Sequence, residues 1–322
     1  MKFPIDSASQ DKLSRDVIVV QLGAANIGSF TKPGPAALPT TLRSHAHQEY
    51  QIGPGDVISI FVFDHPELAI PTASDSVYNG FLVQSDGSLS YPFIGSVAAK
   101  GKTVEELRAE LEQRLARFFP APQVDVRIAA FNAQRVVVGG EVRTPNTQPI
   151  KATPLTLLEA LNAAGGLTEQ ADPRAITLRR GGVNHRVDLD GFLSAGLSEN
   201  NPALVAEDVV SVPRKKLREA YLLGEVQTPA TINLSDDSIT LTQAITRQGG
   251  INEARADARG VFVFRDVAGK MTVYQLDTSL PTALLLGARF TLEPGDVVYI
   301  TKSPLQRWND TVSRLLPSVA AV

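Results

Sequence analysis

A segment of this chain occurs twice at a constant separation. Residues 140–145 read GEVRTP and residues 224–229 read GEVQTP, so the two copies lie 84 residues apart. Residues 156–161 (TLLEAL) and 240–245 (TLTQAI) have the same separation, and a pair of glycines follows each. An ungapped separation over this span indicates that one folding unit was duplicated. Repeats of this kind usually build a binding or assembly scaffold, so the search for function begins with architecture.

Length, composition and charge limit the classes of function. The 322 residues suffice for two or three domains, and 43% hydrophobic with 20% charged residues is typical of a folded protein with proper cores. The net charge is −3 and the longest basic run is Arg214-Lys215-Lys216, which argues against nucleic acid as a partner. The chain has no cysteine, which excludes disulfides, thiolate metal sites and cysteine nucleophiles.

Residues 1–48 are interpreted as an extended arm. They contain one strand-like run, residues 16–20, and a Pro/Gly/Ala-rich stretch at residues 32–39. Too few large apolar residues are present to bury a core, so we expect the arm to add its strand to another domain. The polar residues that follow Phe3-Pro4 do not form the apolar region of a signal peptide. No run in the chain is as long and apolar as an ordinary transmembrane helix.

Residues 49–133 are interpreted as a compact β-rich domain with one helix. Residues 57–63 alternate as a strand, and Asp86-Gly87 predicts a tight turn. Thr103 and Glu106 have the spacing of a capping box at the start of the helix. The helix should carry one apolar stripe, made of Val104, Leu107, Leu111, Leu115 and Phe118.

The two repeats are assigned to residues 134–217 and 218–302. Each reads strand, strand, helix, strand, strand, and each helix begins with a capping-box pattern and stops at paired glycines. This order predicts an α+β fold, with a small sheet and one helix on one of its faces. An aspartate begins the last strand of each repeat and also follows Gly55, which we attribute to turn chemistry.

The tail, residues 303–322, predicts an amphipathic helix that could dock on its own domain or meet lipid with its apolar side. The predicted apolar face comprises Leu305, Trp308, Val312, Leu315, Leu316 and Val319, and the polar face comprises Arg307, Asp310 and Arg314. One such helix cannot span a bilayer because its polar side has no partner there, whereas a closed ring of them can.

No catalytic, cofactor or metal pattern is recognisable. His45 and His47 lack a further ligand at metal-binding spacing, and a general-base role for His65 has no support from its neighbours. The paired glycines follow helices, whereas phosphate-binding loops precede them. We therefore predict that the protein is not an enzyme and that it holds no cofactor and no metal.

Residues 50–57 (YQIGPGDV) and 64–68 (DHPEL), then the two repeats, then residues 292–300 (LEPGDVVYI) follow one another along the chain. In these motifs the chain resembles the Wza-type outer-membrane polysaccharide export lipoproteins of Gram-negative bacteria. The first two motifs look like the start of the family's polysaccharide-export domain. The two repeats are similar to the family's soluble-ligand-binding β-grasp domains. Residues 292–300 (LEPGDVVYI) with 303–309 (SPLQRWN) look like the junction into its C-terminal membrane helix.

The resemblance implies a multi-domain α+β subunit of a ring, typically an octamer. Its C-terminal helices would form a barrel through the outer membrane above a large periplasmic portion. Such a ring exports capsular polysaccharide or exopolysaccharide and works with an inner-membrane co-polymerase, often a tyrosine kinase. The strand in the arm would pair into a repeat domain. Family members begin with a signal peptide and a lipidated cysteine. We therefore expect this sequence to start after the lipidated cysteine that would anchor the protein.

Three functions remain as hypotheses. The first is a passive export conduit in the outer membrane. The second is a soluble periplasmic module that holds a glycan or a small ligand. The third, an enzyme of glycan processing, lacks a visible acid and base pair.

Overall fold

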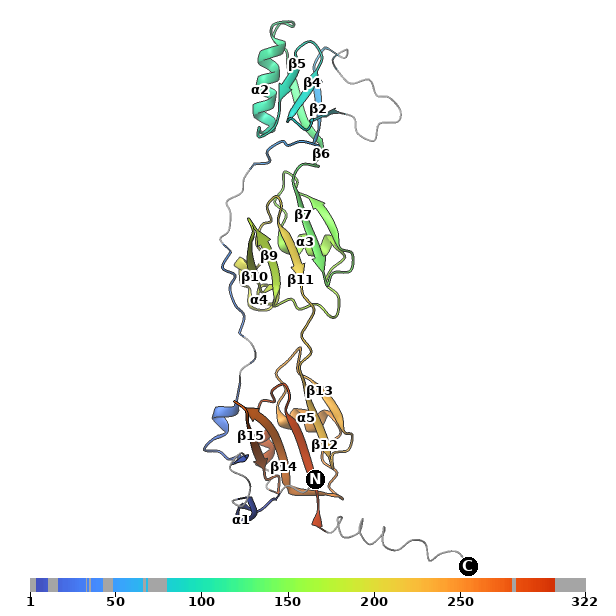
Figure 1. Ribbon diagram of the computed structural model, residues 1–322. Coiled ribbons are helices and arrows are strands. Elements are labelled where there is room, and N and C mark those ends of the chain that lie inside the picture. Colours follow the sequence, from blue (N-terminus) through green and yellow to red (C-terminus); the bar gives the residue numbers. More distant parts are fainter. Residues whose placement is uncertain are drawn as a thin grey trace, which may run out of the picture. The chain divides into compact units, whose positions relative to one another are not determined.

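The computed structural model describes residues 4–10, 17–32, 34, 36–42, 49–65, 68, 80–279 and 282–304. The chain forms two compact units, one of residues 37–215 and one that combines the chain before residue 37 with the chain from residue 216 on. Below, residues 49–133 are called the first domain, residues 134–217 the first repeat and residues 218–302 the second repeat. Figure 1 shows the elements in chain order.

In its described residues, the first domain consists of two small sheets and one α-helix (Figure 1). The strand orders are β3-β2-β6 and β4-β5. The elements are β2 (Val57–Val62), β3 (Phe81–Leu82), β4 (Ser88–Tyr91), β5 (Gly95–Ala98), α2 (Val104–Leu115) and β6 (Val124–Ala130). The predicted turn forms at Asp86-Gly87, where the Asp86 carboxylate accepts from the Ser88 N–H at 2.9 Å. The strands on either side of this turn nevertheless pair elsewhere, β3 with β2 and β4 with β5.

The capping box of α2 is confirmed, because the Thr103 hydroxyl accepts from the Glu106 N–H and the Glu106 carboxylate accepts from the Thr103 N–H. Leu107, Leu111 and Leu115 are fully buried, as the predicted stripe requires. The assignment of Phe118 to that stripe is wrong. The helix ends at Leu115, so the chain leaves the helical phase, and Phe118 is 54% exposed. Phe119 packs against the core instead.

Each repeat folds as a mixed sheet with helices. The strand order in the first repeat is β10-β9-β11-β7-β8, and β7 and β11 are parallel. Its elements are β7 (Arg135–Gly140), β8 (Asn146–Pro149), α3 (Leu157–Ala163), β9 (Ile176–Arg180), β10 (Val183–Val187), α4 (Leu189–Ala195), η3 (Ser198–Asn200) and β11 (Val209–Val212). Leu157, Ala160 and Leu161 of α3 are buried in the same core as the sheet residues Val136 and Val210.

The second repeat has the same plan with one added strand. Its sheet order is β1-β15-β14-β16-β12-β13. Its elements are β12 (Glu219–Gly224), β13 (Ala230–Asn233), α5 (Leu241–Arg247), β14 (Ala256–Val267), β15 (Lys270–Leu276), α6 (Ala283–Gly287) and β16 (Val297–Lys302). The capping boxes predicted at Thr156 and Thr240 are both present. Each repeat also contains a second short helix, α4 or α6, that the sequence pattern did not predict.

The arm contributes side chains to the cores of both repeats. It contains α1 (Ser7–Gln10), β1 (Val17–Gln21) and η1 (Ile27–Phe30). Strand β1 lies parallel to β15, and Leu22 and Ile27 are buried in the core of the second repeat. Farther along, Leu42 is buried in the core of the first repeat. The arm therefore supplies apolar side chains to two domains that follow it in the sequence.

Three buried aspartates close the turns that precede β2, β11 and β16. Asp56, Asp208 and Asp296 are at most 1% exposed, and each accepts a hydrogen bond from the N–H of the residue three positions earlier. We call them the turn aspartates. Their burial is compensated by these hydrogen bonds and by further partners, which differ between the domains. Their role is structural, as turn chemistry predicts.

Candidate functional site

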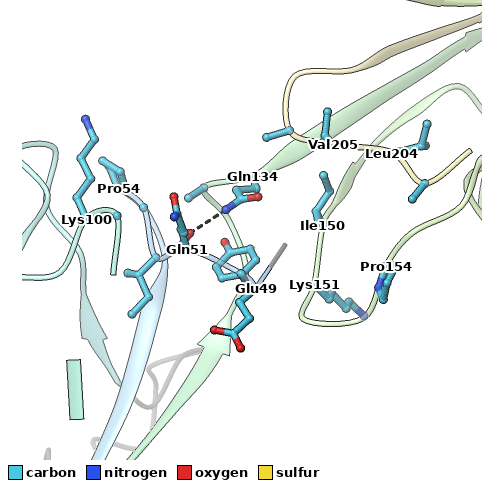
Figure 2. Close-up of a pocket in the computed structure, with 17 residues that line it drawn as sticks. Glu49, Gln51, Pro54, Lys100, Gln134, Ile150, Lys151, Pro154, Leu204 and Val205 are labelled. Atoms are coloured by element: carbon cyan, nitrogen blue, oxygen red, sulfur yellow. Dashed lines mark hydrogen bonds between the residues drawn. The ribbon is translucent and has the colours of Figure 1, made fainter. Parts of the chain in front are cut away.

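A cavity of about 600 Å³ lies within the unit of residues 37–215, between the first domain and the first repeat. Figure 2 shows Pro54 and Lys100 on one side of it and Ile150, Leu204 and Val205 on the other. The lining residues come from separate stretches of the chain: residues 49–54, 100–101, 133–134, 150–151, 154 and 203–206.

The turn aspartate Asp56 holds two of these stretches together. Its buried carboxylate accepts from the Gly53 N–H at 2.9 Å and from the Ala133 N–H at 2.8 Å. The Tyr50 hydroxyl donates to the same carboxylate at 2.9 Å, and the Asn132 N–H donates to it at 2.7 Å. Burial, together with the hydrogen bond to Asp56, raises the pKa of Tyr50 well above its usual value near 10. The wall of the cavity is therefore anchored by a buried, charge-assisted network.

We expect Tyr50→Phe to destabilise the first domain by about 1.5–3 kcal/mol, because it removes a hydrogen bond to a buried charge. Chemical denaturation of the full chain measures this loss. The matched control is Tyr91→Phe, whose hydroxyl donates to a neutral carbonyl, that of Leu68, at 3.3 Å. That change should cost about 1 kcal/mol or less. Equal losses in both variants would contradict the assigned role of the Tyr50 hydroxyl.

The same network predicts a loss of stability at alkaline pH. Folded Tyr50 keeps its proton at a pH where unfolded tyrosine loses it. Its contribution is thus complete below the unfolded pKa, near 10, and is lost as the pH rises through the higher folded pKa. In Tyr50→Phe, the decrease in the free energy of unfolding above about pH 10 should be smaller than in the unaltered chain.

The chemistry of the cavity suits binding. Ile150 and Leu204 form apolar walls, and the exposed side chains of Glu49, Lys100 and Lys151 add charge at the rim. Of its 17 lining residues, only Glu49 carries a carboxylate, so these residues do not supply the acid and base pair that glycoside hydrolysis uses. The Gln134 side chain donates to the Gln51 carbonyl at 2.8 Å (Figure 2), which bridges the two domains at the cavity.

The predicted faces of the tail helix, from Leu305 to Val319, lie outside the described residues, as do His45 and His47. The ring of His65 lies at a tilt to that of Phe119 with centroids 4.4 Å apart, and His185 lies on β10 opposite Leu178. Within the described ranges, no three His, Asp or Glu side chains gather in a way that could hold a metal ion. Across the same part of the chain, no helix has both the length and the apolar character needed to cross a membrane.

Sequence reasoning missed the cavity because its lining comes from segments more than 100 residues apart. Residues 50–56, of which 50–54 line the cavity, have a recognisable local pattern, and that pattern predicts a turn and the start of a strand rather than a cavity. Asn132 and Ala133, whose N–H groups donate to Asp56, do not belong to a periodic sequence pattern.

Comparison with known proteins identifies the class. The profile of the polysaccharide biosynthesis/export protein family matches residues 44–129, and that of the SLBB domain matches residues 134–212 and 218–300. The EPS I polysaccharide export outer membrane protein EpsA of Ralstonia nicotianae is 37% identical over 285 residues, which is 84% of this chain and 75% of the relative. The capsule polysaccharide export protein BexD of Haemophilus influenzae is 29% identical over 288 residues, covering 79% of this chain and 71% of the relative.

A third relative, the capsule polysaccharide export outer membrane protein CtrA of Neisseria meningitidis, is also 29% identical over 288 residues, with 78% of this chain and 71% of the relative covered. These matches span both the export domain and the two repeats in one order. The chain therefore belongs to the polysaccharide export outer membrane proteins, and it carries one export domain and two SLBB domains. The resemblance noted from the sequence is confirmed.

Proposed function

We propose that this chain is a subunit of an outer-membrane translocon that exports capsular polysaccharide or exopolysaccharide. The observation that carries the proposal is the 37% identity to an exopolysaccharide export protein over 285 residues, which include both the export domain and the repeats. The relatives named for capsule export support the same activity. They favour export over the alternative of a soluble periplasmic module that binds a glycan or small ligand.

In this proposal the subunits assemble as a ring, with a large periplasmic portion built from the first domain and the repeats. The tail contributes one helix per subunit to a barrel in the outer membrane. Leu305, Trp308, Val312, Leu315, Leu316 and Val319 would face lipid or a neighbouring helix, while Arg307, Asp310 and Arg314 would face water. In a closed ring of amphipathic helices the polar sides face the water-filled interior, whereas a single helix would leave its polar side without a partner in lipid.

The proposed conduit is passive and requires no catalytic residue, cofactor or metal. An inner-membrane polysaccharide co-polymerase, with or without a tyrosine kinase, would deliver the polymer to the periplasmic side. Incubation of purified protein with the polymer should leave its chain-length distribution unchanged. A shift to shorter chains would instead support a glycan-processing enzyme.

Deletion of the gene should abolish surface polysaccharide in the strain that encodes this chain, and the native protein should restore it. Detergent-solubilised protein should have the mass of a multimer.

In the restored strain, Val312→Asp with Leu316→Asp should block export, because carboxylates would be placed on the proposed lipid side. Ser313→Asp is the matched control, because the helical period places Ser313 on the polar side with Arg314, and it should export normally. Full export by the double variant, or a monomer in detergent, would contradict the proposed channel.

A further inference from the structure

The first domain carries an exposed group of rings where α2 and β2 end. We call Phe93, Phe118, Phe119 and His65 the aromatic tip. Phe93 is 61% exposed and Phe118 is 54% exposed, whereas Phe119 packs against the core. The ring of Phe93 lies 5.3 Å from that of Phe119, nearly perpendicular to it, and 6.0 Å from that of Phe118. The ring of His65 lies at a tilt to that of Phe119, with centroids 4.4 Å apart. The exposed ring of Phe93 is therefore held against the partly buried ring of Phe119, and Phe118 contacts Phe93 in turn.

The backbone at the tip is held in costly conformations. Phe93, Asp64 and Ala121 are non-glycine residues with φ of 66°, 63° and 48°. Such strain is retained where the surrounding structure enforces it, often at functional sites. Phe93 lies at the tip of the β4–β5 hairpin, two residues after Tyr91, which is 2% exposed and fills the core. The hairpin thus buries one ring and directs the next one outward.

Polar residues lie on the same hairpin as Phe93 and beside Phe118 in the chain. Ser90 and Ser96 face each other on the hairpin and are both exposed. Arg117, the residue before Phe118, is also exposed, and Arg114 donates to the Ser96 carbonyl at 3.0 Å. A protein partner favours a continuous apolar patch of several hundred Å². Separate ring faces beside hydroxyl and guanidinium groups match a pyranose ring instead, because a sugar presents one C–H face and an edge of hydroxyls.

We propose that the aromatic tip is a stacking platform for the sugar rings of the exported polymer. The inference depends on the proposed function, which supplies the carbohydrate chain. Phe93 and Phe118 stack on the C–H faces of successive sugars, and the serine and arginine groups beside them bond the sugar hydroxyls. The contact is non-covalent and tolerant of sugar type, which suits a polymer that must leave this site as it is exported.

The test uses the full chain and short fragments of the surface polysaccharide purified from the strain that encodes it. Titration calorimetry should show that Phe93→Leu with Phe118→Leu weakens binding at least about tenfold, about 1.4 kcal/mol. Leucine keeps the apolar character but has no ring face, so the loss separates stacking from general hydrophobic contact. Phe93→Tyr with Phe118→Tyr should bind like the unaltered chain. In saturation-transfer NMR, irradiation of aromatic protons should reach the C–H protons of the sugar.

The matched control is Phe61→Leu with Phe63→Leu. These rings are 46% and 50% exposed and meet edge to face, and Phe61 lies on the face of β2 opposite to the core residues Ile60 and Val62. Their replacement should leave the affinity unchanged. Equal weakening by both pairs, or no weakening by the tip pair, would overturn the proposal. So would loss of export by the tip variant with unchanged fragment binding, because that result would assign the tip to a protein partner. Failure of the unaltered chain to restore export tests the proposed function separately.

Discussion

Gly224→Ala should destabilise the second repeat by at least about 3 kcal/mol, because two penalties act at once. Gly224 has φ of 90°, a conformation that alanine adopts at a cost. It also pairs with Ile300 across the parallel strands β12 and β16, and a Cβ at this position would overlap the Ile300 carbonyl oxygen. Hydrogen exchange should show loss of protection in β12 and β16. Gly140→Ala should have the same effect on the first repeat, where the overlap is with Val212.

Gly250→Ala is the matched control in the same repeat. Gly250 has φ of 89°, yet nothing lies within 4 Å of a Cβ built on it. This variant therefore carries only the conformational penalty, about 1–2 kcal/mol. Similar losses for Gly224→Ala and Gly250→Ala would show that the contact between strands is not what makes glycine necessary in the GEV segment.

Arg265→Ala should destabilise the second repeat by about 3–5 kcal/mol, since it leaves a buried carboxylate without its partner. Arg265 is 8% exposed and donates to both oxygens of the turn aspartate Asp296, at 2.8 and 2.7 Å. It also donates to Glu293 at 2.6 Å. Its guanidinium lies over the rings of Tyr274 and Phe290. Thermal unfolding of the full chain should show a lower transition temperature.

Arg127→Ala provides the comparison, because Arg127 pairs with Asp125 at the surface with side-chain exposures of 78% and 40%. Removal of that pair should cost no more than about 1 kcal/mol. In a double-mutant cycle, Arg265→Ala with Asp296→Ala should lose less stability than the two single changes together, because the lone buried charge is gone. Additive losses would show that the two side chains act independently.

The duplication could be predicted because local chemistry repeats with it. The capping boxes at Thr156 and Thr240 and the paired glycines depend on neighbours within a few residues, so they are visible in the sequence. The mixed α+β class followed from this local order and is present in the structure. Helices α4 and α6 were missed because they are short and lack a strong apolar period.

Long-range contacts could not be predicted in the same way. Phe118 has the helical spacing of a core residue, but helix α2 ends three residues earlier, and the Phe118 ring contacts that of Phe93 instead. The partners of Asp56 include Ala133, which is 77 residues away in the chain. Such contacts depend on how the strands of different sheets come together, and no local pattern encodes that. The amphipathic tail remains a prediction.

Strand β1 has a consequence for how the protein is made. Val17 at its start pairs with Met271, so β1 is synthesised long before the strand with which it pairs. Until β15 emerges, the apolar side chains of Leu22 and Ile27 have no finished core to enter. A chain that is interrupted before β15 therefore leaves β1 unpaired and these two apolar side chains exposed.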